Sequence, residues 1–140
     1  MTLLNEYLEP RKMHQVFNED EVRHFLTPRD DVVYCYVAGG QPGEPLTEIF
    51  SFYNLSSSVL NHFTHRTLKV AYSYYNVSLT GRLKEGMKEC LVRAKAMNFD
   101  VFNALDALEN SEFLEELAFG VGDGELYYYL YNWRIRKILV

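Results

Sequence analysis

The 140-residue sequence has only two cysteines, and it contains no long hydrophobic run. Cys35 and Cys90 lie far apart without a C-x-x-C pair, which excludes a disulfide framework and a zinc ribbon. No stretch approaches the roughly 20 apolar residues of a membrane span, and residues 1–26 lack the features of a secretory signal peptide. These absences predict a soluble, cytoplasmic protein without a membrane span, in which both cysteines are buried as small apolar side chains.

The sequence is also short of positive charge. Its 14 basic side chains are outnumbered by 19 acidic ones, which gives a formal net charge of -5. Nucleic-acid binders neutralise phosphates with clustered lysine and arginine, so this balance disfavours a nucleic-acid partner and suits a cationic one better. Hydrophobic residues make up 48% of the chain and aromatic residues 15%, which excludes a disordered chain, and the length of 140 residues predicts one domain with one core.

Apolar residues at helical spacing predict four helices. The clearest covers residues 82–97, where the apolar side chains share one face and most charged side chains lie elsewhere. A second covers residues 19–26, with Asn18 as its N-cap and three acidic residues in its first turn. Shorter helices are predicted at 2–8 and 111–117. Such helices must bury their apolar faces against other elements, which implies a sheet beneath them.

Segments rich in β-branched and aromatic residues predict the strands of that sheet. Residues 31–38 and 48–54 flank a turn rich in glycine and proline, so they form a predicted hairpin. A polar loop over 56–65 leads to a third, central strand at 67–77. Residues 126–133 are nearly all aromatic or aliphatic, as expected for a strand buried on both faces. Helices that interrupt the strands place the fold in the α/β (α+β) class with a mixed sheet.

Three short motifs lack the partners that a catalytic, metal or nucleic-acid site needs. His62 and His65 have no third metal ligand beside them, so we expect solvent-exposed loop histidines and no metal site. The three serines at 56–58 lack the G-x-S-x-G elbow of a serine hydrolase. The tyrosines at 126–133 lack the basic groove that accompanies a platform for stacking nucleic-acid bases.

The glycine-rich segment at 120–124 is open to two interpretations. It precedes a predicted strand and has no Lys-Ser/Thr ending, so it is neither a P-loop nor a dinucleotide-binding fingerprint. It is either a tight turn with positive φ angles or a loop whose glycines let a ligand approach Asp123 closely. From the residues alone we favour the turn. Taken this far, the sequence indicates a soluble α/β domain that suits a cationic ligand.

Five longer strings are far more specific than these motifs. They are SFYNLSS at 51–57, AYSYYNV at 71–77, FDVFNALD at 99–106, FGVGDG at 119–124 and YYYLYNW at 127–133. In residues, order and spacing they resemble the C-terminal lobe of the eukaryotic glycylpeptide N-myristoyltransferases. The resemblance extends over about residues 4–133.

This resemblance implies a fold and an activity. Members of the family consist of two related halves of the GNAT-type acyltransferase fold, so we expect one such half, with a mixed twisted sheet flanked by helices. In the family, the N-terminal half chiefly holds myristoyl-CoA and supplies the oxyanion hole, and the C-terminal half forms most of the peptide groove. The resemblance therefore implies that residues 1–140 form a single domain, the peptide-binding lobe of an N-myristoyltransferase that transfers myristate from myristoyl-CoA to an N-terminal glycine.

The resemblance also implies the residues of the site. The positions that match the family's peptide groove are Ser57, Leu68, Tyr72, Asn103, Asp123 and Leu126. The family's general base is its C-terminal carboxylate, which here belongs to Val140. The segment before that residue is several residues shorter than the family's tail, although the ending Ile-Leu-Val keeps its aliphatic character. Ser56 stands where the family commonly has proline.

The implied partners are glycine-initiated peptides, the N-terminal lobe, and a second copy of the chain, because apolar surface left uncovered promotes self-association. We expect no cofactor on this lobe and no activity from the isolated chain, because myristoyl-CoA and the oxyanion hole belong to the N-terminal lobe. Two other functions remain open. One is a peptide- or protein-binding fragment without transferase activity. The other is a single-lobed GNAT-type acetyltransferase, although no strand-loop-helix pyrophosphate site is visible.

Overall fold

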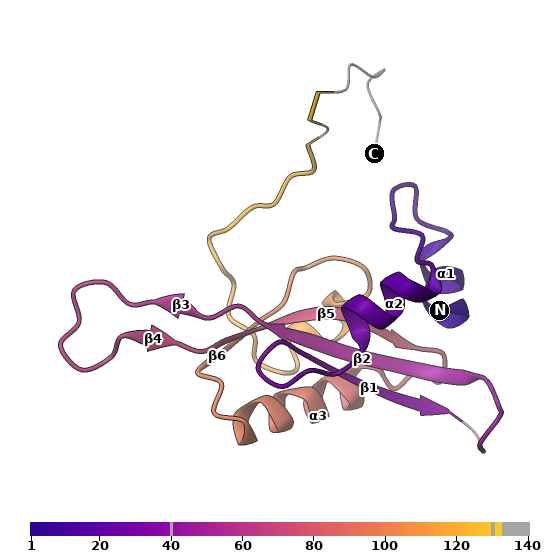
Figure 1. Cartoon of the computed structure of the whole chain (residues 1–140), viewed down its shortest axis with the longest axis horizontal. Helices are drawn as coiled ribbons and strands as arrows, with labels where there is room; N and C mark the ends of the chain where they lie inside the picture. Colours follow the sequence, from indigo (N-terminus) through magenta and orange to yellow (C-terminus); the bar gives the residue numbers. More distant parts are fainter. Residues whose placement is uncertain (40, 130, 133–140) are drawn as a thin grey trace.

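The computed structural model describes residues 1–39, 41–129 and 131–132, and a four-stranded mixed sheet forms its centre (Figure 1). In spatial order the strands are β1 (Val33–Gly39), β2 (Leu46–Asn54), β5 (Val70–Ser78) and β6 (Val101–Asn103). The first three pair antiparallel, whereas β6 runs parallel to β5. The predicted hairpin and the mixed sheet are therefore confirmed, and the predicted third strand does lie inside the sheet.

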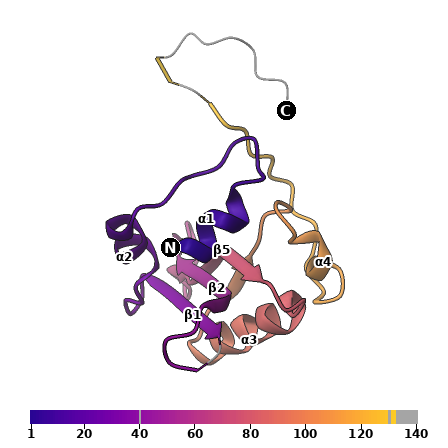
Figure 2. The ribbon, with the colours of Figure 1, turned by 90° about the vertical axis from the view of Figure 1, so that its right-hand side faces the viewer.

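Helices cover both faces of this sheet (Figure 2). They are α1 (Thr2–Leu8) and α2 (Glu19–Leu26) on one face, and α3 (Leu83–Ala96) and α4 (Ser111–Leu114) on the other. All four predicted helices are present, the last one shorter than predicted. The predicted cap of α2 is confirmed, because the Asn18 side chain accepts a hydrogen bond from the backbone N–H of Glu21 at 2.9 Å.

The face under α3 carries a core of aromatic side chains. Phe52 is fully buried, with its ring stacked on Tyr34 at 5.0 Å and edge-on to Phe99 at 5.9 Å between ring centroids. Gly86 allows α3 to lie close to the sheet, because a Cβ at this position would overlap the ring of Phe50. Close packing on this face therefore depends on a residue without a side chain.

The opposite face is covered only in part. Phe17 and residues of α1 and α2 pack on Ile49 and Val77, towards one end of β2 and β5. Tyr53 and Tyr72 lie towards the other end of the same two strands and are only half-buried. Because side chains alternate between the faces of a strand, Tyr53 shares a face with Ile49. We call this part of the sheet the uncovered end.

A β-bulge in β5 determines which side chains share that face. β5 contains one extra residue where it passes Ser51 of β2. The Ser51 hydroxyl donates to the carbonyl of Tyr75 at 2.8 Å and accepts from its N–H at 3.0 Å. Tyr72 and Val77 are five residues apart and would face opposite sides of a regular strand. The bulge therefore allows Tyr72 to lie on the same face as the buried Val77.

The predicted polar loop at 56–65 is in part a second hairpin. β3 (Ser57–Ser58) pairs antiparallel with β4 (Thr67–Leu68), and this hairpin extends away from the four-stranded sheet (Figure 1). Lys69 separates β4 from β5, so the single strand predicted at 67–77 is two strands. The physical reason is that β4 pairs with β3, whereas β5 pairs with β2 and β6.

The cysteines differ in their burial. Cys90 in α3 is buried, as predicted, whereas Cys35 in β1 is only half-buried. Both are free thiols. Burial raises the pKa of Cys90 from its usual value near 9 to about 12 and that of Cys35 to about 11. Both side chains therefore stay protonated and unreactive near neutral pH.

Two predictions for the C-terminal segment are wrong within the described residues. Residues 126–129 form no strand, and Tyr127 and Tyr128 are 66% and 89% exposed instead of being buried on both faces. The segment leaves the body of the fold, and no described strand pairs with it (Figures 1 and 2). Aromatic composition favours a strand, but burial also requires a layer on each side.

The three glycines at 120–124 have no positive φ, so the predicted tight turn is absent too. The predicted strand's Leu130 and Trp133 lie outside the described residues.

Candidate functional site

Four of the predicted groove residues form two cross-strand pairs. In the β3–β4 hairpin, Ser57 lies directly opposite Leu68. In the four-stranded sheet, Tyr72 of β5 lies opposite Asn103 of β6. Only three residues separate Leu68 from Tyr72 along the chain, so the two pairs are close neighbours. The fold thus brings together residues that are up to 46 positions apart in the sequence.

The Tyr72–Asn103 pair lies on the uncovered end of the sheet. Tyr72 stacks on Tyr53 with 5.6 Å between ring centroids and 16° between ring planes. Tyr74 packs edge-on against Tyr53 at 5.5 Å. Asn103 is exposed at the edge strand β6. An aromatic floor beside an exposed amide suits an extended peptide, because the rings bury apolar area and the amide both donates and accepts hydrogen bonds.

Two hydroxyls of this floor, those of Tyr53 and Tyr74, stay protonated at neutral pH. Burial raises the pKa of Tyr53 above its usual value, and the neighbouring Tyr72 adds to this increase. Burial likewise raises the pKa of Tyr74, with smaller contributions from Tyr75 and Tyr53. These hydroxyls therefore act as neutral hydrogen-bond donors or acceptors, and they supply no negative charge to a ligand.

The Ser57–Leu68 pair is open to solvent. Ser57 is exposed, and Leu68 has 36% of its surface exposed. The neighbouring Ser56 hydroxyl donates to the side-chain oxygen of Asn54 at 2.7 Å, which ties the start of the hairpin to the end of β2. The hairpin therefore presents one hydroxyl and one apolar side chain beside the uncovered end.

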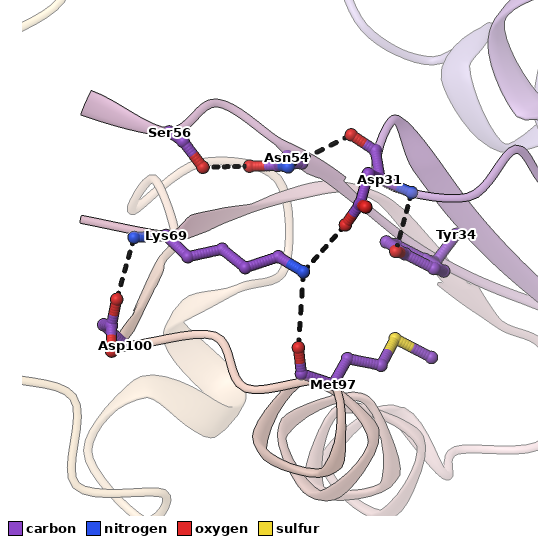
Figure 3. A network of polar contacts seen from close by, with 7 residues as sticks. All are labelled: Asp31, Tyr34, Asn54, Ser56, Lys69, Met97 and Asp100. Atoms are coloured by element: carbon purple, nitrogen blue, oxygen red, sulfur yellow. Dashed lines mark hydrogen bonds and ion pairs between the residues drawn. The ribbon is translucent and has the colours of Figure 1, made fainter. Parts of the chain in front are cut away.

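A polar network that the sequence analysis missed surrounds Lys69, which lies between Leu68 and Tyr72 in the chain (Figure 3). The Lys69 ammonium donates to Asp31 at 2.7 Å and to the carbonyl of Met97 at 3.3 Å. The backbone N–H of Lys69 donates to the Asp100 carboxylate at 2.8 Å. A sequence signal for part of this network existed, because a lysine interrupts an apolar strand pattern and marks a break. Nothing in the sequence identified Asp31 as its partner.

The structure does not bring the remaining predicted site residues to these pairs. Asp123 and Leu126 lie in the exposed segment after α4, and Leu126 has 75% of its surface exposed. Their predicted roles stay predictions. Val140, the predicted general base, lies outside the described residues.

Metal ligands do not gather anywhere in the part of the chain that the structure describes: no group of three or more histidine, cysteine, aspartate or glutamate side chains could hold an ion. His62 and His65 lie exposed in the β3–β4 hairpin, where the Nδ1 atom of His62 accepts from the N–H of His65 at 3.1 Å. Within the same described residues, no helix is long and apolar enough to cross a membrane.

Comparison with known proteins identifies the family to which this chain belongs. The family model described as "Myristoyl-CoA:protein N-myristoyltransferase, C-terminal domain" matches residues 1–140. The chain belongs to this N-myristoyltransferase family. The resemblance found in the sequence strings is therefore confirmed.

Curated relatives of this N-myristoyltransferase domain are much longer than the chain itself. Glycylpeptide N-tetradecanoyltransferase 2 of Bos taurus is 46% identical over 132 residues, which cover 94% of this chain and 26% of the bovine protein. Glycylpeptide N-tetradecanoyltransferase 1 of Arabidopsis thaliana is 44% identical over 137 residues, which cover 98% of this chain and 32% of the plant protein. The chain thus spans about a quarter to a third of the relatives it matches.

Solved structures support the same fold for the N-myristoyltransferase domain. Saccharomyces cerevisiae N-myristoyltransferase with bound myristoyl-CoA matches with a TM-score of 0.71 and 29% identity, over 88% of this chain and 33% of the yeast chain. A ribosomal-protein-alanine N-acetyltransferase from Brucella melitensis matches with a TM-score of 0.61 and 16% identity, over 93% of this chain and 89% of that one. At that identity the second match shows the fold alone. The predicted GNAT-type half with a mixed sheet and flanking helices is confirmed.

Proposed function

We propose that this chain is the peptide-binding lobe of an N-myristoyltransferase, which transfers myristate from myristoyl-CoA to the N-terminal glycine of substrate proteins. The observation that carries the proposal is the pairing of Tyr72 with Asn103 on the uncovered end, next to the Ser57–Leu68 pair. Family membership supports it, and so do relatives named glycylpeptide N-tetradecanoyltransferase.

The proposed groove holds the substrate peptide in an extended form. Tyr72 and Leu68 contact its apolar surface, while Ser57 and Asn103 offer hydrogen bonds to its backbone. Asp123 and Leu126 complete the groove when their segment lies across it, with the Asp123 carboxylate facing cationic groups of the peptide. The net charge of -5 supports a cationic peptide over an acidic one.

In the proposed reaction, the glycine ammonium first loses a proton, because only the free amine has a lone pair for attack. The amine nitrogen then attacks the thioester carbonyl, an amide bond forms, and the C–S bond breaks. The second amine proton passes to the departing sulfur, so that CoA leaves as its thiol. We assign the first proton to the C-terminal carboxylate of Val140. An α-carboxylate has an unperturbed pKa of about 3.5, so this role requires burial that raises its pKa.

We assign myristoyl-CoA to an N-terminal lobe outside this chain, so that this lobe binds peptide and no cofactor. The chain's span of 26% to 32% of its relatives supports this division. That lobe is the expected partner, and the isolated chain is expected to lack transferase activity.

The free cysteines support a reducing, cytoplasmic location. Exposed apolar side chains at 126–129 support self-association of the isolated chain.

A direct test measures peptide binding and myristoyl transfer on the same sample of the 140-residue chain. A glycine-initiated peptide is titrated by calorimetry, with an alanine-initiated peptide as the matched control, and transfer from myristoyl-CoA is assayed in parallel. Selective binding without transfer supports the proposal. Transfer by this chain alone would overturn the division between lobes. Absence of binding to either peptide would contradict the groove itself.

A further inference from the structure

We propose that Asp31 and Lys69 form a clamp that fixes the β3–β4 hairpin against the four-stranded sheet and so sets the spacing between the Ser57–Leu68 pair and the Tyr72–Asn103 pair. Both are positioning residues in this proposal, since neither belongs to the proposed groove. The functional part of the inference rests on the peptide groove proposed above.

Asp31 contacts both legs of the hairpin at its base (Figure 3). Its backbone carbonyl accepts from the side-chain amide of Asn54 at 3.0 Å, at the end of β2 where the first leg begins. Its carboxylate accepts from the ammonium of Lys69 at 2.7 Å, at the end of the second leg. One residue therefore joins the two points at which the hairpin leaves the sheet.

Asp31 is itself held in an uncommon backbone conformation. Its φ angle is 56°, in the left-handed region that Asp and Asn tolerate better than other residues with side chains. The N–H of Asp31 donates to the hydroxyl of Tyr34 at 2.9 Å, and the Tyr34 ring stacks on the buried Phe52. The clamp is thus attached to the best-packed part of the core.

Lys69 connects the hairpin to the far side of the sheet as well. Its ammonium lies 4.6 Å from the centroid of the Phe99 ring and donates to the carbonyl of Met97 at the end of α3. Its backbone N–H donates to the Asp100 carboxylate, and its carbonyl accepts from the N–H of Asp100 at 2.8 Å. Lys69 therefore links β4 to α3 and to the segment that leads into β6, which carries Asn103.

The electrostatics of the clamp favour a positioning role over a stabilising one. The hydrogen bond with Asp31 is the main reason that the pKa of Lys69 is raised above its usual value. The side chain of Asp31 is 72% exposed, and ion pairs that are open to solvent contribute little to global stability. The contacts instead join the base of the hairpin to the end of β2, to the end of α3 and to the segment before β6.

The test compares variants of the 140-residue chain in two measurements. Asp31→Asn removes the charge but retains tolerance of the left-handed conformation and the carbonyl that binds Asn54. Lys69→Met removes the ammonium and keeps most of the side-chain length, and Lys69→Arg restores the cation. Glu19→Gln is the matched control, because it breaks an exposed ion pair with Arg23 in α2, away from the hairpin.

The first measurement is hydrogen exchange of the Val59 amide, which donates to the Arg66 carbonyl across the hairpin, compared with the Met87 amide in α3. We expect Val59 to exchange roughly 2- to 5-fold faster in Asp31→Asn and in Lys69→Met, with Met87 unchanged. Lys69→Arg and Glu19→Gln should match the parent chain. Unchanged exchange of Val59, or equal acceleration at both amides, would overturn the clamp.

The second measurement is calorimetric binding of a glycine-initiated peptide. We expect Asp31→Asn and Lys69→Met each to weaken binding by roughly 2- to 5-fold, and the double variant to bind no more weakly than Lys69→Met, because that substitution already removes the ion pair with Asp31. Affinity that is unchanged while the hairpin opens faster would overturn the positioning role. If the parent chain binds no peptide, the proposed groove is wrong, and the exchange data still decide whether the clamp exists.

Discussion

The two faces of the sheet differ in how completely the chain covers them. Under α3, aromatic rings such as Phe52 are fully buried, and Gly86 lets the helix lie directly on the sheet. On the opposite face, α1 and α2 cover Ile49 and Val77 but leave the tyrosines near the β5–β6 end half-buried. The contrast indicates that the first face stabilises the fold, whereas the uncovered end of the second is available to bind a ligand.

The largest expected effect comes from removing the ring at the centre of the α3 face. Phe52→Ala should lower the free energy of unfolding by about 3–5 kcal/mol, because it leaves a cavity among Tyr34, Phe99 and the helix. Urea denaturation followed by circular dichroism measures this change. Tyr72→Ala, which removes a ring of similar size from the uncovered end, is the control. An equal loss of stability in both variants would remove the distinction between the two faces.

A smaller loss of stability is expected where the helix approaches the sheet. Gly86→Ala places a methyl group into the ring of Phe50, so the helix must shift, at a cost of about 1–3 kcal/mol. An alanine substitution of an exposed lysine in the same helix changes stability by about 0.5 kcal/mol or less, and Lys88→Ala provides that comparison. Thermal melting distinguishes them, and a stabilised Gly86→Ala variant would refute the close approach.

Tyr72→Ala should weaken peptide binding more than it lowers stability, which is the reverse of what we expect for Phe52→Ala. It removes the ring that stacks on Tyr53, so we expect the affinity for a glycine-initiated peptide to fall roughly tenfold. The free energy of unfolding should change less than in Phe52→Ala, because Tyr72 is only half-buried. Paired calorimetry and denaturation measure both quantities. Full peptide affinity in this variant would show that the uncovered end is not the binding surface.

The smallest expected effect concerns pH and the buried thiol of α3. Burial raises the pKa of Cys90 to about 12 in the folded chain, whereas an unfolded cysteine has a pKa near 8.5. A raised folded pKa gives stability that is fully present below the unfolded pKa and is lost as the pH rises above it. We expect Cys90 to lower the free energy of unfolding by about 1 kcal/mol between pH 7.5 and pH 9.5, and Cys35, whose pKa is raised to about 11, to add a similar fall. Cys90→Ala should lack the Cys90 contribution, and an identical pH dependence in that variant would contradict it.

The sequence predicted most of the sheet and helices because those elements follow from local patterns. Apolar side chains recur at helical spacing over residues 83–96, and Asn18 is followed three positions later by the glutamate of a capping box. The break at Lys69 was missed because strand pairing, rather than composition, separates β4 from β5. The aromatic segment after residue 125 was predicted as a buried strand because aromatic composition indicates burial. Burial depends on neighbouring layers that the segment itself does not contain.

The candidate site was predictable only where a resemblance supplied it. Neither the residue type of Tyr72 nor that of Asn103 marks it as part of a binding site. Their pairing follows from the parallel register of β5 and β6. Asp31 could not be found at all, because its role depends on a left-handed backbone and on a lysine 38 residues away. Contacts of this kind arise from the topology, and a sequence pattern does not encode them locally.

The most direct test of the central claim is an amide hydrogen-exchange footprint of a glycine-initiated peptide on the 140-residue chain. Our account predicts slower exchange at the hairpin strands β3 and β4 and at the β5–β6 end near Tyr72 and Asn103, with the amides of α3 unchanged. Protection that is confined to α3, or to the end of the sheet under α1 and α2, would contradict the assignment of the uncovered end as the peptide-binding surface.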